Sequence, residues 1–347
     1  MALSATLFID DQASLIQYLC PSLKQQVAGS FYNNTWTTVN HQDCEKGWFE
    51  YTFYGTGIQV AAYIASPDAS YSVKIDDGAF EPQTRNGTYN SPTLSDGKHT
   101  LTYATGSLKT LPSFDYLTVT AGPSTQLAGQ TLAVDDSATS IFYFGSWATS
   151  PPPSVAIDAS NPLYANTAHW SSNIGDSLKF QFTGSSISVY GIVANVSSTQ
   201  NITATYTIDG VSQVQSLPQG TLNSLPMVKL FHADVQPGDH TLFMNITDIQ
   251  ATRAIGVDFI TYDASFNSIS PANAASIHDG VGTNTALNLG AKVGLAIGVV
   301  AAAIFLAGLS IIFWRRRPLS KAENPKFPLP DNSAVNVAKP NQPALTW

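Results

Sequence analysis

Acidic and histidine side chains recur at matching places in the two halves of the 347-residue chain. Asp10-Asp11 and Asp135-Asp136 each close a short apolar stretch, and His99 and His240 each follow a glycine-containing turn. Histidine and aspartate together can act in acid–base or nucleophilic catalysis. The chain has no G-x-S-x-G, H-E-x-x-H or Cys/His metal spacing, which are the patterns that mark such sites. Further matched residues are His41 and His169, and Asp115 and Asp258.

These polar residues are best explained as ties between turns and strand ends, because buried polar groups must be hydrogen-bonded. A hydrolase built from them is the less favoured interpretation, and we expect no enzymatic activity. Paired carboxylates also bind Ca²⁺ in many proteins, but the two aspartate pairs lack a third nearby ligand in the sequence. We therefore expect no metal or other cofactor, with a calcium site as the open alternative.

Aromatic side chains are the second group that could bind a ligand. Sugar rings present C–H faces that pack on indole or phenol rings, while their hydroxyls need a few polar partners. Several Trp and Tyr residues lie beside Asn, His and Ser in expected loops or at strand ends. The alternative is that these rings fill the core of a β-sandwich. The predicted sugar-binding residues are Trp36, Trp147, Trp170, Tyr63 and Tyr190.

A duplicated pattern of alternating residues positions these groups. GWFEYTFYGTGIQVAAY (47–63) matches GDSLKFQFTGSSISVYG (175–191), and Ile58 and Val60 correspond to Ile187 and Val189 at a spacing of 129. A period of two predicts strands with one buried face, and the glycine turns link them. No other stretch before the apolar segment near the C-terminus has a helical period. We predict an all-β fold of two tandem antiparallel jelly-roll β-sandwiches, plus one transmembrane α-helix and a disordered tail.

The order of motifs adds a resemblance to a known family. It reads DD, F-x-F-x-G-x-x-I-x-V-Y-G, Y-x-I-D-G, G-x-H-T-L and V-D-F-I. This order resembles the galactose-binding-domain-like β-sandwich units of fungal single-pass membrane proteins, and the resemblance covers essentially the whole chain. It implies two such units, a stalk, one membrane helix and a tail. The first unit departs from the pattern by about 14 extra residues between Tyr18 and Trp36, relative to Tyr143 and Trp147, and these residues include Cys20.

An uncharged segment of 22 residues, Val293 to Trp314, is long enough for a membrane helix, since about 1.5 Å per residue gives about 33 Å. Arg315, Arg316 and Arg317 follow it, which places the tail in the cytosol and the body outside the plasma membrane. A buried core helix is the disfavoured alternative. MALSATLFIDDQ has no basic start, so we expect a signal upstream or one that is unrecognised, with the segment 293–314 acting as its own signal anchor as the alternative. The predicted parts are 1–120 (first sandwich), 121–130 (linker), 131–263 (second sandwich), 264–292 (low-complexity stalk), 293–314 (membrane helix) and 315–347 (tail).

Charge and cysteine content agree with this topology. Residues 1–292 carry 10 basic and 22 acidic side chains, whereas residues 293–347 carry 6 and 2. An acidic body argues against nucleic-acid binding. A Cys20–Cys44 disulfide would suit an extracellular body, and two unpaired thiols are the alternative. Glycosylation sequons precede the apolar segment at Asn33, Asn86, Asn195, Asn201 and Asn245.

Small residues at a spacing of four precede and enter the predicted membrane helix, at Gly290, Gly294, Gly298 and Ala302. Such a stripe allows close helix–helix approach and hence a homodimer, with plain anchoring as the alternative.

Together these patterns predict a single-pass cell-surface membrane glycoprotein whose ectodomain binds glycans or surface glycoproteins. The first alternative is a structural or sensor protein without a sugar pocket. The second is an ectoenzyme that acts on glycans, for which two carboxylates in one cleft would be the sign.

Overall fold

The computed structural model describes residues 5–269, except for 28, 41–43, 65–70, 84–86, 106–111, 154, 156–162, 195–201, 218–223 and 251. Several predictions therefore lie outside the described residues. They concern His41, the sequons Asn86, Asn195 and Asn201, the helix-packing positions Gly290, Gly294, Gly298 and Ala302, the membrane helix and the tail. Among the described residues, no helix has the length and apolar character needed to cross a bilayer.

The first repeat contains a 3-10 turn, η1 (Tyr32–Asn34), and eleven described strands. These are β1 (Thr6–Asp10), β2 (Gln17–Tyr18), β3 (Ser22–Gln26), β4 (Thr35–Val39), β5 (Cys44–Gly55), β6 (Gly57–Tyr63), β7 (Tyr71–Ile75), β8 (Glu81–Gln83), β9 (Tyr89–Asn90), β10 (Gly97–Thr105) and β11 (Ser113–Thr120). One sheet has the order β2-β5-β10-β7-β8, and the other strands belong to a larger sheet that continues into the second repeat.

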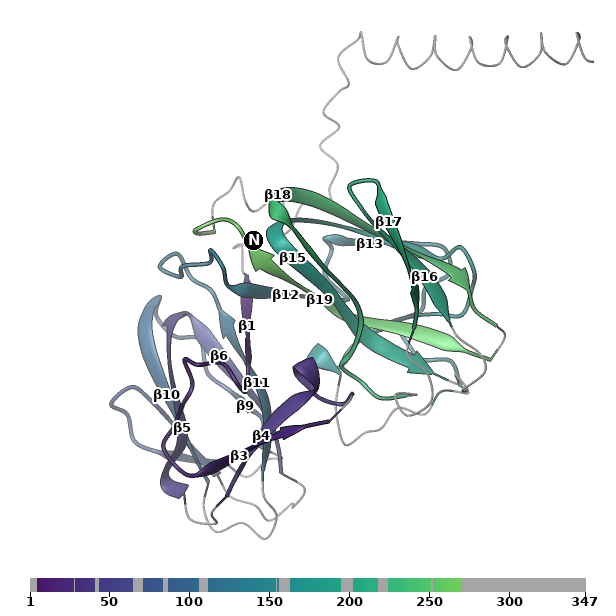
Figure 1. The fold of residues 1–347 in the computed structure, drawn as a ribbon. Coiled ribbons are helices and arrows are strands. Elements are labelled where there is room, and N and C mark those ends of the chain that lie inside the picture. Colours follow the sequence, from purple (N-terminus) through teal and green to yellow (C-terminus); the bar gives the residue numbers. More distant parts are fainter. Residues whose placement is uncertain are drawn as a thin grey trace, which may run out of the picture. The chain divides into compact units, whose positions relative to one another are not determined.

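The second repeat contains η2 (Tyr164–Asn166) and eight described strands. These are β12 (Thr131–Asp135), β13 (Ile141–Phe144), β14 (His169–Ser171), β15 (Ser177–Ala194), β16 (Thr203–Ile208), β17 (Val211–Ser216), β18 (Val228–Asp248) and β19 (Ala254–Ala264). The long strands β15 and β18 lie side by side along most of their length (Figure 1). All pairings between the described strands of both repeats are antiparallel. The predicted all-β, antiparallel architecture is therefore confirmed for the described residues.

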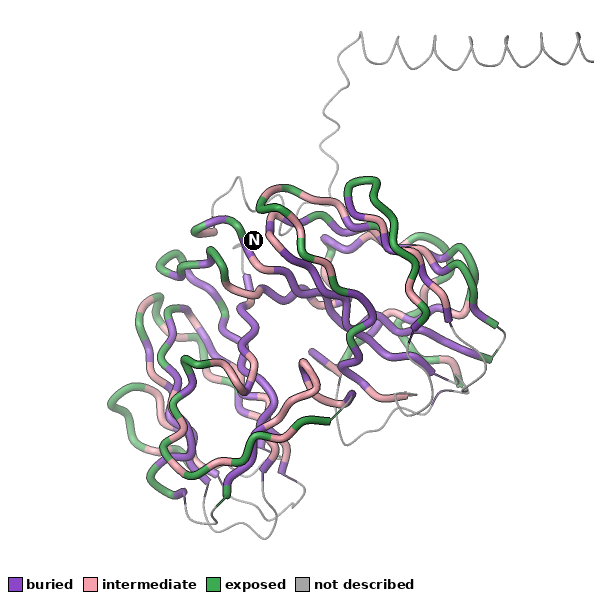
Figure 2. The backbone as a smooth tube through the Cα atoms, in the orientation of Figure 1, coloured by how far each residue is buried: buried purple, intermediate pink, exposed green. Residues whose placement is uncertain are grey.

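Alternation decides which residues enter the core. Phe49 is fully buried and Tyr51 and Phe53 are nearly so, and Phe180 and Phe182 occupy the equivalent places in the second repeat. The residues between them face outward, as a strand period of two requires. The buried stretches run along β11, β12, β15 and β19, in the middle of the described part (Figure 2).

The two repeats share one sheet. β1 of the first repeat pairs with β12 of the second through Thr6↔Ala133 and Leu7↔Leu132. The segment 121–130 is not a free linker, because Leu127 is fully buried and its N–H donates to the Asn267 carbonyl at 3.0 Å. Phe266 is also buried in the core, so the first residues of the predicted stalk pack on the second repeat.

The Cys20–Cys44 disulfide is confirmed. It ties the segment after β2 to the first residue of β5. Neither cysteine is free, so the alternative of two unpaired thiols is excluded.

The sequence alignment around the 3-10 turns was wrong. Asn33 and Ala165 have φ of 49° and 48°, and Asn34 and Asn166 both have φ of 64°. The turn Y-N-N-T therefore corresponds to Y-A-N-T, which pairs Thr37 of the first repeat with His169 of the second. His41 is thus not the counterpart of His169, and Trp36 is not the counterpart of Trp147. The apparent insertion in the first repeat disappears, because its segment from Tyr18 to the turn is the shorter of the two.

Candidate functional site

A β-bulge in the first repeat aims an aspartate out of the regular ladder. On β11, Phe114 pairs with Ala62 and Tyr116 pairs with Ala61, so Asp115 has no opposite residue on β6. Bulges redirect side chains in this way. Asp115 is 8 % exposed, and its Oδ1 accepts the Tyr32 N–H of η1 at 2.8 Å. The bulge therefore fixes both the carboxyl group and the turn that follows β3.

The second repeat has a β-bulge at the corresponding aspartate. Tyr190 pairs with Phe259 and Gly191 with Val257, which leaves Asp258 as the extra residue on β19. The Asp258 Oδ2 accepts the Tyr164 N–H of η2 at 3.3 Å, and its Oδ1 has no hydrogen-bond partner in the structure. The bulged aspartate thus holds the 3-10 turn in both repeats, which agrees with the predicted structural role of the repeated acidic residues.

The carboxyl groups of Asp10 and Asp11 lie close enough to Asp115 to affect its pKa. Asp11 is fully buried, and it accepts the hydroxyls of Thr35 at 2.7 Å and Thr37 at 2.5 Å. Burial raises the pKa of Asp11 to about 7, although the two hydroxyls lower it. Burial also raises the pKa of Asp115 well above its usual range, and the charges of Asp11 and Asp10 add to the rise. The described residues at this end of the first repeat are therefore rich in hydrogen-bond acceptors.

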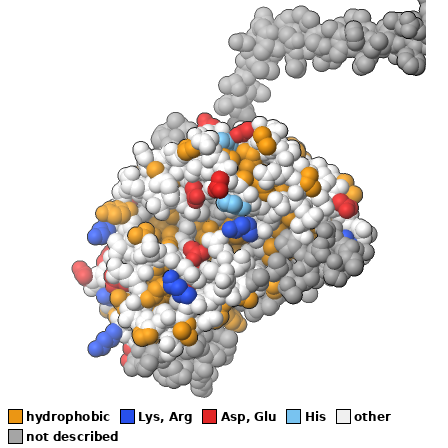
Figure 3. Space-filling view, viewed as in Figure 1, with side chains coloured by type: hydrophobic (Ala, Val, Ile, Leu, Met, Phe, Trp, Pro, Cys, Tyr) orange, Lys and Arg blue, Asp and Glu red, His pale blue; other side chains and the backbone are white. Residues whose placement is uncertain are grey.

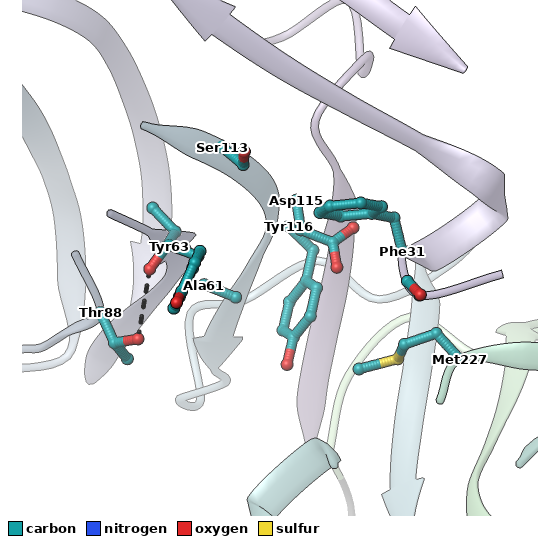
Figure 4. A pocket seen from close by; sticks show the side chains of 10 residues that line it. Phe31, Ala61, Tyr63, Thr88, Ser113, Asp115, Tyr116 and Met227 are labelled. Atoms are coloured by element: carbon teal, nitrogen blue, oxygen red, sulfur yellow. Dashed lines mark hydrogen bonds between the residues drawn. The ribbon is translucent and has the colours of Figure 1, made fainter. Parts of the chain in front are cut away.

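Asp115 borders a small depression of about 50 Å³ that is open to solvent. Half-buried rings of Phe31 and Tyr63 and the buried ring of Tyr116 surround it. In Figure 4 the Asp115 carboxyl group lies between the Phe31 and Tyr116 side chains, with Tyr63 and Thr88 on the other side of the depression. Ser30, Thr88 and Ser113 contribute hydroxyls, and Met227 of the second repeat completes the wall. We call this depression the first-repeat pocket.

The corresponding place in the second repeat is filled. Thr37 pairs with Phe114 as His169 pairs with Val257, so Trp170 occupies the position of Thr38. Trp170 is 2 % exposed. A Cβ on the opposite Gly256 would lie only 3.0 to 3.1 Å from three ring atoms.

The Trp170 ring therefore packs directly on Gly256. The corresponding residues of the first repeat are Thr38 and Ser113. Ile192, fully buried, replaces Tyr63. Trp170 cannot serve as the predicted sugar platform, because the indole is part of the core with Val155, Ile192 and Ala254.

Of the other predicted aromatic residues, Tyr190 is buried, whereas Trp147 and Trp36 are half-buried. Tyr190 is 1 % exposed, stacks on Phe259 at 4.7 Å and also leaves the candidate set. Trp147 is half-buried, and its Nε1 donates to the Ser177 carbonyl at 3.1 Å. Trp36 is half-buried and stacks on Phe31 with ring centroids 5.6 Å apart. Tyr63 thus lines the first-repeat pocket, and Trp36 stacks on Phe31, which also lines it.

Tyr63 is the one lining residue of the pocket that the sequence analysis listed as ligand-binding, and Phe31 and Asp115 are among those it missed. The sequence analysis had already matched Asp115 with Asp258, and the turn that Asp115 holds, Y-N-N-T, has its counterpart in Y-A-N-T.

The pairs His99–Asp76 and His240–Asp209 act as structural ties, as predicted. The His99 ring bonds the Asp76 carboxyl at 2.8 Å through Nδ1 and the Ser95 carbonyl at 2.8 Å through Nε2. The hydrogen bond to Asp76 raises the pKa of His99. His240 makes the same two bonds to Asp209 and to the Gln236 carbonyl, both at 2.6 Å. Because both ring nitrogens are used, neither histidine has a nitrogen left to activate a nucleophile.

Metal ligands do not gather in the described part of the chain: no group of three His, Cys, Asp or Glu side chains there could hold an ion. On the face drawn in Figure 3, the Lys and Arg side chains stand apart from one another.

The two described sequons differ in their surroundings. Asn33 Nδ2 donates to Asp10 at 3.0 Å, and its Oδ1 accepts from Tyr190 and Lys229, both at 3.0 Å. A glycan on this amide would displace contacts that join the repeats. Asn245 is half-buried on β18.

Neither a protein-family model nor a curated protein matches the chain. Among solved structures, the CBM36-1 domain of a xylanase from the Trinervitermes trinervoides hindgut metagenome has 9 % identity and a TM-score of 0.26, over 38 % of this chain and 94 % of that domain. The CBM22-1–CBM22-2 tandem of Paenibacillus barcinonensis Xyn10C has 8 % identity and a TM-score of 0.27, over 75 % and 93 %. A family two carbohydrate esterase from Cellvibrio japonicus has 14 % identity and a TM-score of 0.26, over 34 % of each chain. This chain therefore spans about a third of the esterase. At these identities and TM-scores the likenesses carry no weight for activity.

Proposed function

We propose that this chain binds glycans through the first-repeat pocket. The observation that supports the proposal is the combination of half-buried rings, hydroxyls and one carboxyl group around a single open depression. Aromatic faces pack on the C–H faces of sugars, and a few convergent polar groups set orientation. Phe31 and Tyr63 supply the faces, and Ser113, Thr88 and Asp115 supply the polar partners.

The duplication supports the same proposal. Both repeats keep the bulged aspartate, but the second repeat fills the adjacent space with Trp170, Gly256 and Ile192. A fold that needs only the structural tie can close the space. The first repeat instead leaves it open and lines it with polar and aromatic groups, which is what a ligand site requires.

A panel of oligosaccharides titrated into the full-length chain in detergent micelles tests the proposal. At least one class should bind the wild type, and Tyr63→Ile, which installs the residue of the second repeat, should weaken it by about tenfold or more. Tyr54→Ile is the matched control, because Tyr54 is 51 % exposed and does not line the pocket. No binding by folded wild-type protein, or equal losses in both variants, would contradict the proposal.

A structural or sensor role is the second candidate, and the join between the repeats favours it. The shared sheet and a ring cluster that spans both repeats make a stiff tandem. The ring centroid of Phe8, for example, lies 4.3 Å from that of Tyr116 in the first repeat and 5.3 Å from that of Phe259 in the second. Such stiffness suits a spacer that needs no sugar. Glycan binding that depends on Tyr63 would decide against this candidate.

We also propose that the chain is a single-pass protein of the plasma membrane with the two repeats outside. The support is the uncharged segment 293–314 and the three arginines that follow it. Protease added to intact cells should remove the repeats and leave an epitope tag at the C-terminus protected. Protection of the repeats instead would contradict the proposed orientation.

A further inference from the structure

The carboxyl group of Asp115 is only partly used by the protein. Its one hydrogen bond is the Tyr32 N–H at 2.8 Å, and the ion pairs found in the described residues do not include it. The side chain is nevertheless 8 % exposed and lines the first-repeat pocket. Ionising a buried carboxyl group that has no ion-pair partner among the described residues is costly, so a cationic ligand would stabilise the carboxylate form of Asp115.

Among the described residues, Lys229 is a cation that contacts η1, the turn that Asp115 holds, and its ammonium group is already engaged. Lys229 Nζ donates to Asn33 Oδ1 at 3.0 Å and lies 5.5 Å from the centroid of the Tyr190 ring. The other titratable neighbours, Asp10 and Asp11, are acidic and raise the pKa of Asp115 further. Burial also raises the pKa of the Tyr32 and Tyr116 hydroxyls, so these phenols are neutral donors and acceptors at physiological pH.

The rings around Asp115 favour the same kind of ligand. Phe31, Tyr63 and Tyr116 lie around the pocket in which the carboxyl group stands (Figure 4). An ammonium group is attracted to aromatic faces and offers three donors to the free carboxyl oxygen and the nearby hydroxyls. A sugar hydroxyl offers one neutral donor, and an N-acetylated amine is uncharged and bulkier.

We propose that the first-repeat pocket selects glycans that carry a free protonated amino group, such as 2-amino-2-deoxyhexose units, with the Asp115 carboxylate as the counter-ion. This inference rests on the proposed glycan binding and names its ligand class. A charge-assisted hydrogen bond is about twice as strong as a neutral one. The amino sugar should therefore bind about tenfold or more tightly than its N-acetylated form.

Three tetrasaccharides of equal length separate the possibilities: β-1,4-linked glucosamine, N-acetylglucosamine and glucose. Each is titrated into the full-length chain in detergent at pH 6 and at two salt concentrations. Asp115→Asn keeps the size of the side chain and an oxygen for the Tyr32 N–H, but removes the charge. Asp258→Asn is the matched control, because it makes the same change at the closed bulge of the second repeat.

The expected result is a preference for the glucosamine tetramer that disappears in Asp115→Asn and persists in Asp258→Asn. Equal binding of all three sugars would overturn the inference while leaving the proposed function intact. A preference retained in Asp115→Asn would also overturn it, because general attraction to the acidic body would then explain the selectivity. Failure of all three to bind the wild type would overturn the inference alone if another oligosaccharide of the panel binds, and both proposals if none does.

A measurement on the wild type covers the case in which Asp115→Asn does not fold. Burial raises the pKa of Asp115 well above its usual range, and pairing with an ammonium group lowers that pKa, so binding releases protons to the buffer. Calorimetry at pH 6 in two buffers of different ionisation enthalpy should show this release with the glucosamine tetramer and not with the N-acetylated one. The same proton balance for both sugars would overturn the inference.

Discussion

Trp170→Ala is the sharpest test of the difference between the repeats. The indole is 2 % exposed and packs with Val155, Ile192 and Ala254. It lies so close to Gly256 that a Cβ there would be 3.0 to 3.1 Å from three ring atoms. Removing a large buried side chain costs the transfer free energy of its atoms and the energy of the cavity left behind. For tryptophan the sum is about 3–5 kcal/mol. We expect a loss of unfolding free energy in this range.

Equilibrium unfolding in urea, followed by circular dichroism, measures the change. Trp36→Ala is the matched control, because Trp36 is half-buried and its main ring contact is Phe31. It should cost less than half as much. The comparison uses unfolding free energies obtained at equal slopes against urea, since a changed slope signals a different unfolded or native state.

A cost below about 1 kcal/mol for Trp170→Ala, typical of exposed positions, would refute the reasoning. The Trp170 ring would then be accessible in solution. The pocket of the second repeat would be open, and the asymmetry on which the proposed function depends would be lost.

Three further predictions concern stability. The folded-state pKa of Asp11 is about 7 against 3.8 when unfolded, so the folded protein holds the extra proton and loses stability as pH rises. Urea unfolding should show a loss of about 3 kcal/mol between pH 5 and pH 8 that Asp11→Asn removes, and an unchanged slope in the variant would contradict this. Replacing Cys20 and Cys44 together with serine opens a disulfide at a separation of 24 residues and should cost about 3 kcal/mol; an unchanged urea midpoint would count against it. Asn33→Ala installs the residue found at the same turn position in the second repeat and removes the contacts to Tyr190 and Lys229. It should lower the unfolding free energy by about 1–2 kcal/mol, and no loss would show that these contacts do not couple the repeats.

Strand alternation, the disulfide and the histidine ties were predictable because each depends on local pattern. Phe49, Tyr51 and Phe53 alternate with polar residues, and the buried face follows from that period alone. His99 follows a turn, and its partners lie close to strand ends, Asp76 directly after β7 and Ser95 shortly before β10. In these cases residues that are close in the sequence were enough to predict the contact or the buried face.

The pocket could not be predicted, because it depends on which residues face each other across strands far apart in sequence. Trp170 lies on a strand end and looks exposed in the sequence, yet its opposite residue is Gly256 on β19. Tyr63 looks no different from Tyr190, but the first faces Ser113 and the second faces Phe259. A bulge on β11 then turns Asp115 toward the same place, and bulges leave no mark in hydrophobic periodicity.

The central claim is that the ligand site lies in the first repeat, where Ser113 lines an open pocket and the smaller Thr38 stands at the position of the buried Trp170 of the second repeat. The most direct test transplants the closed arrangement with Thr38→Trp and Ser113→Gly in one chain and measures glycan affinity, alongside urea stability. The account predicts that the folded double variant no longer binds the glycan that the wild type binds. Unchanged affinity in a folded double variant would contradict it.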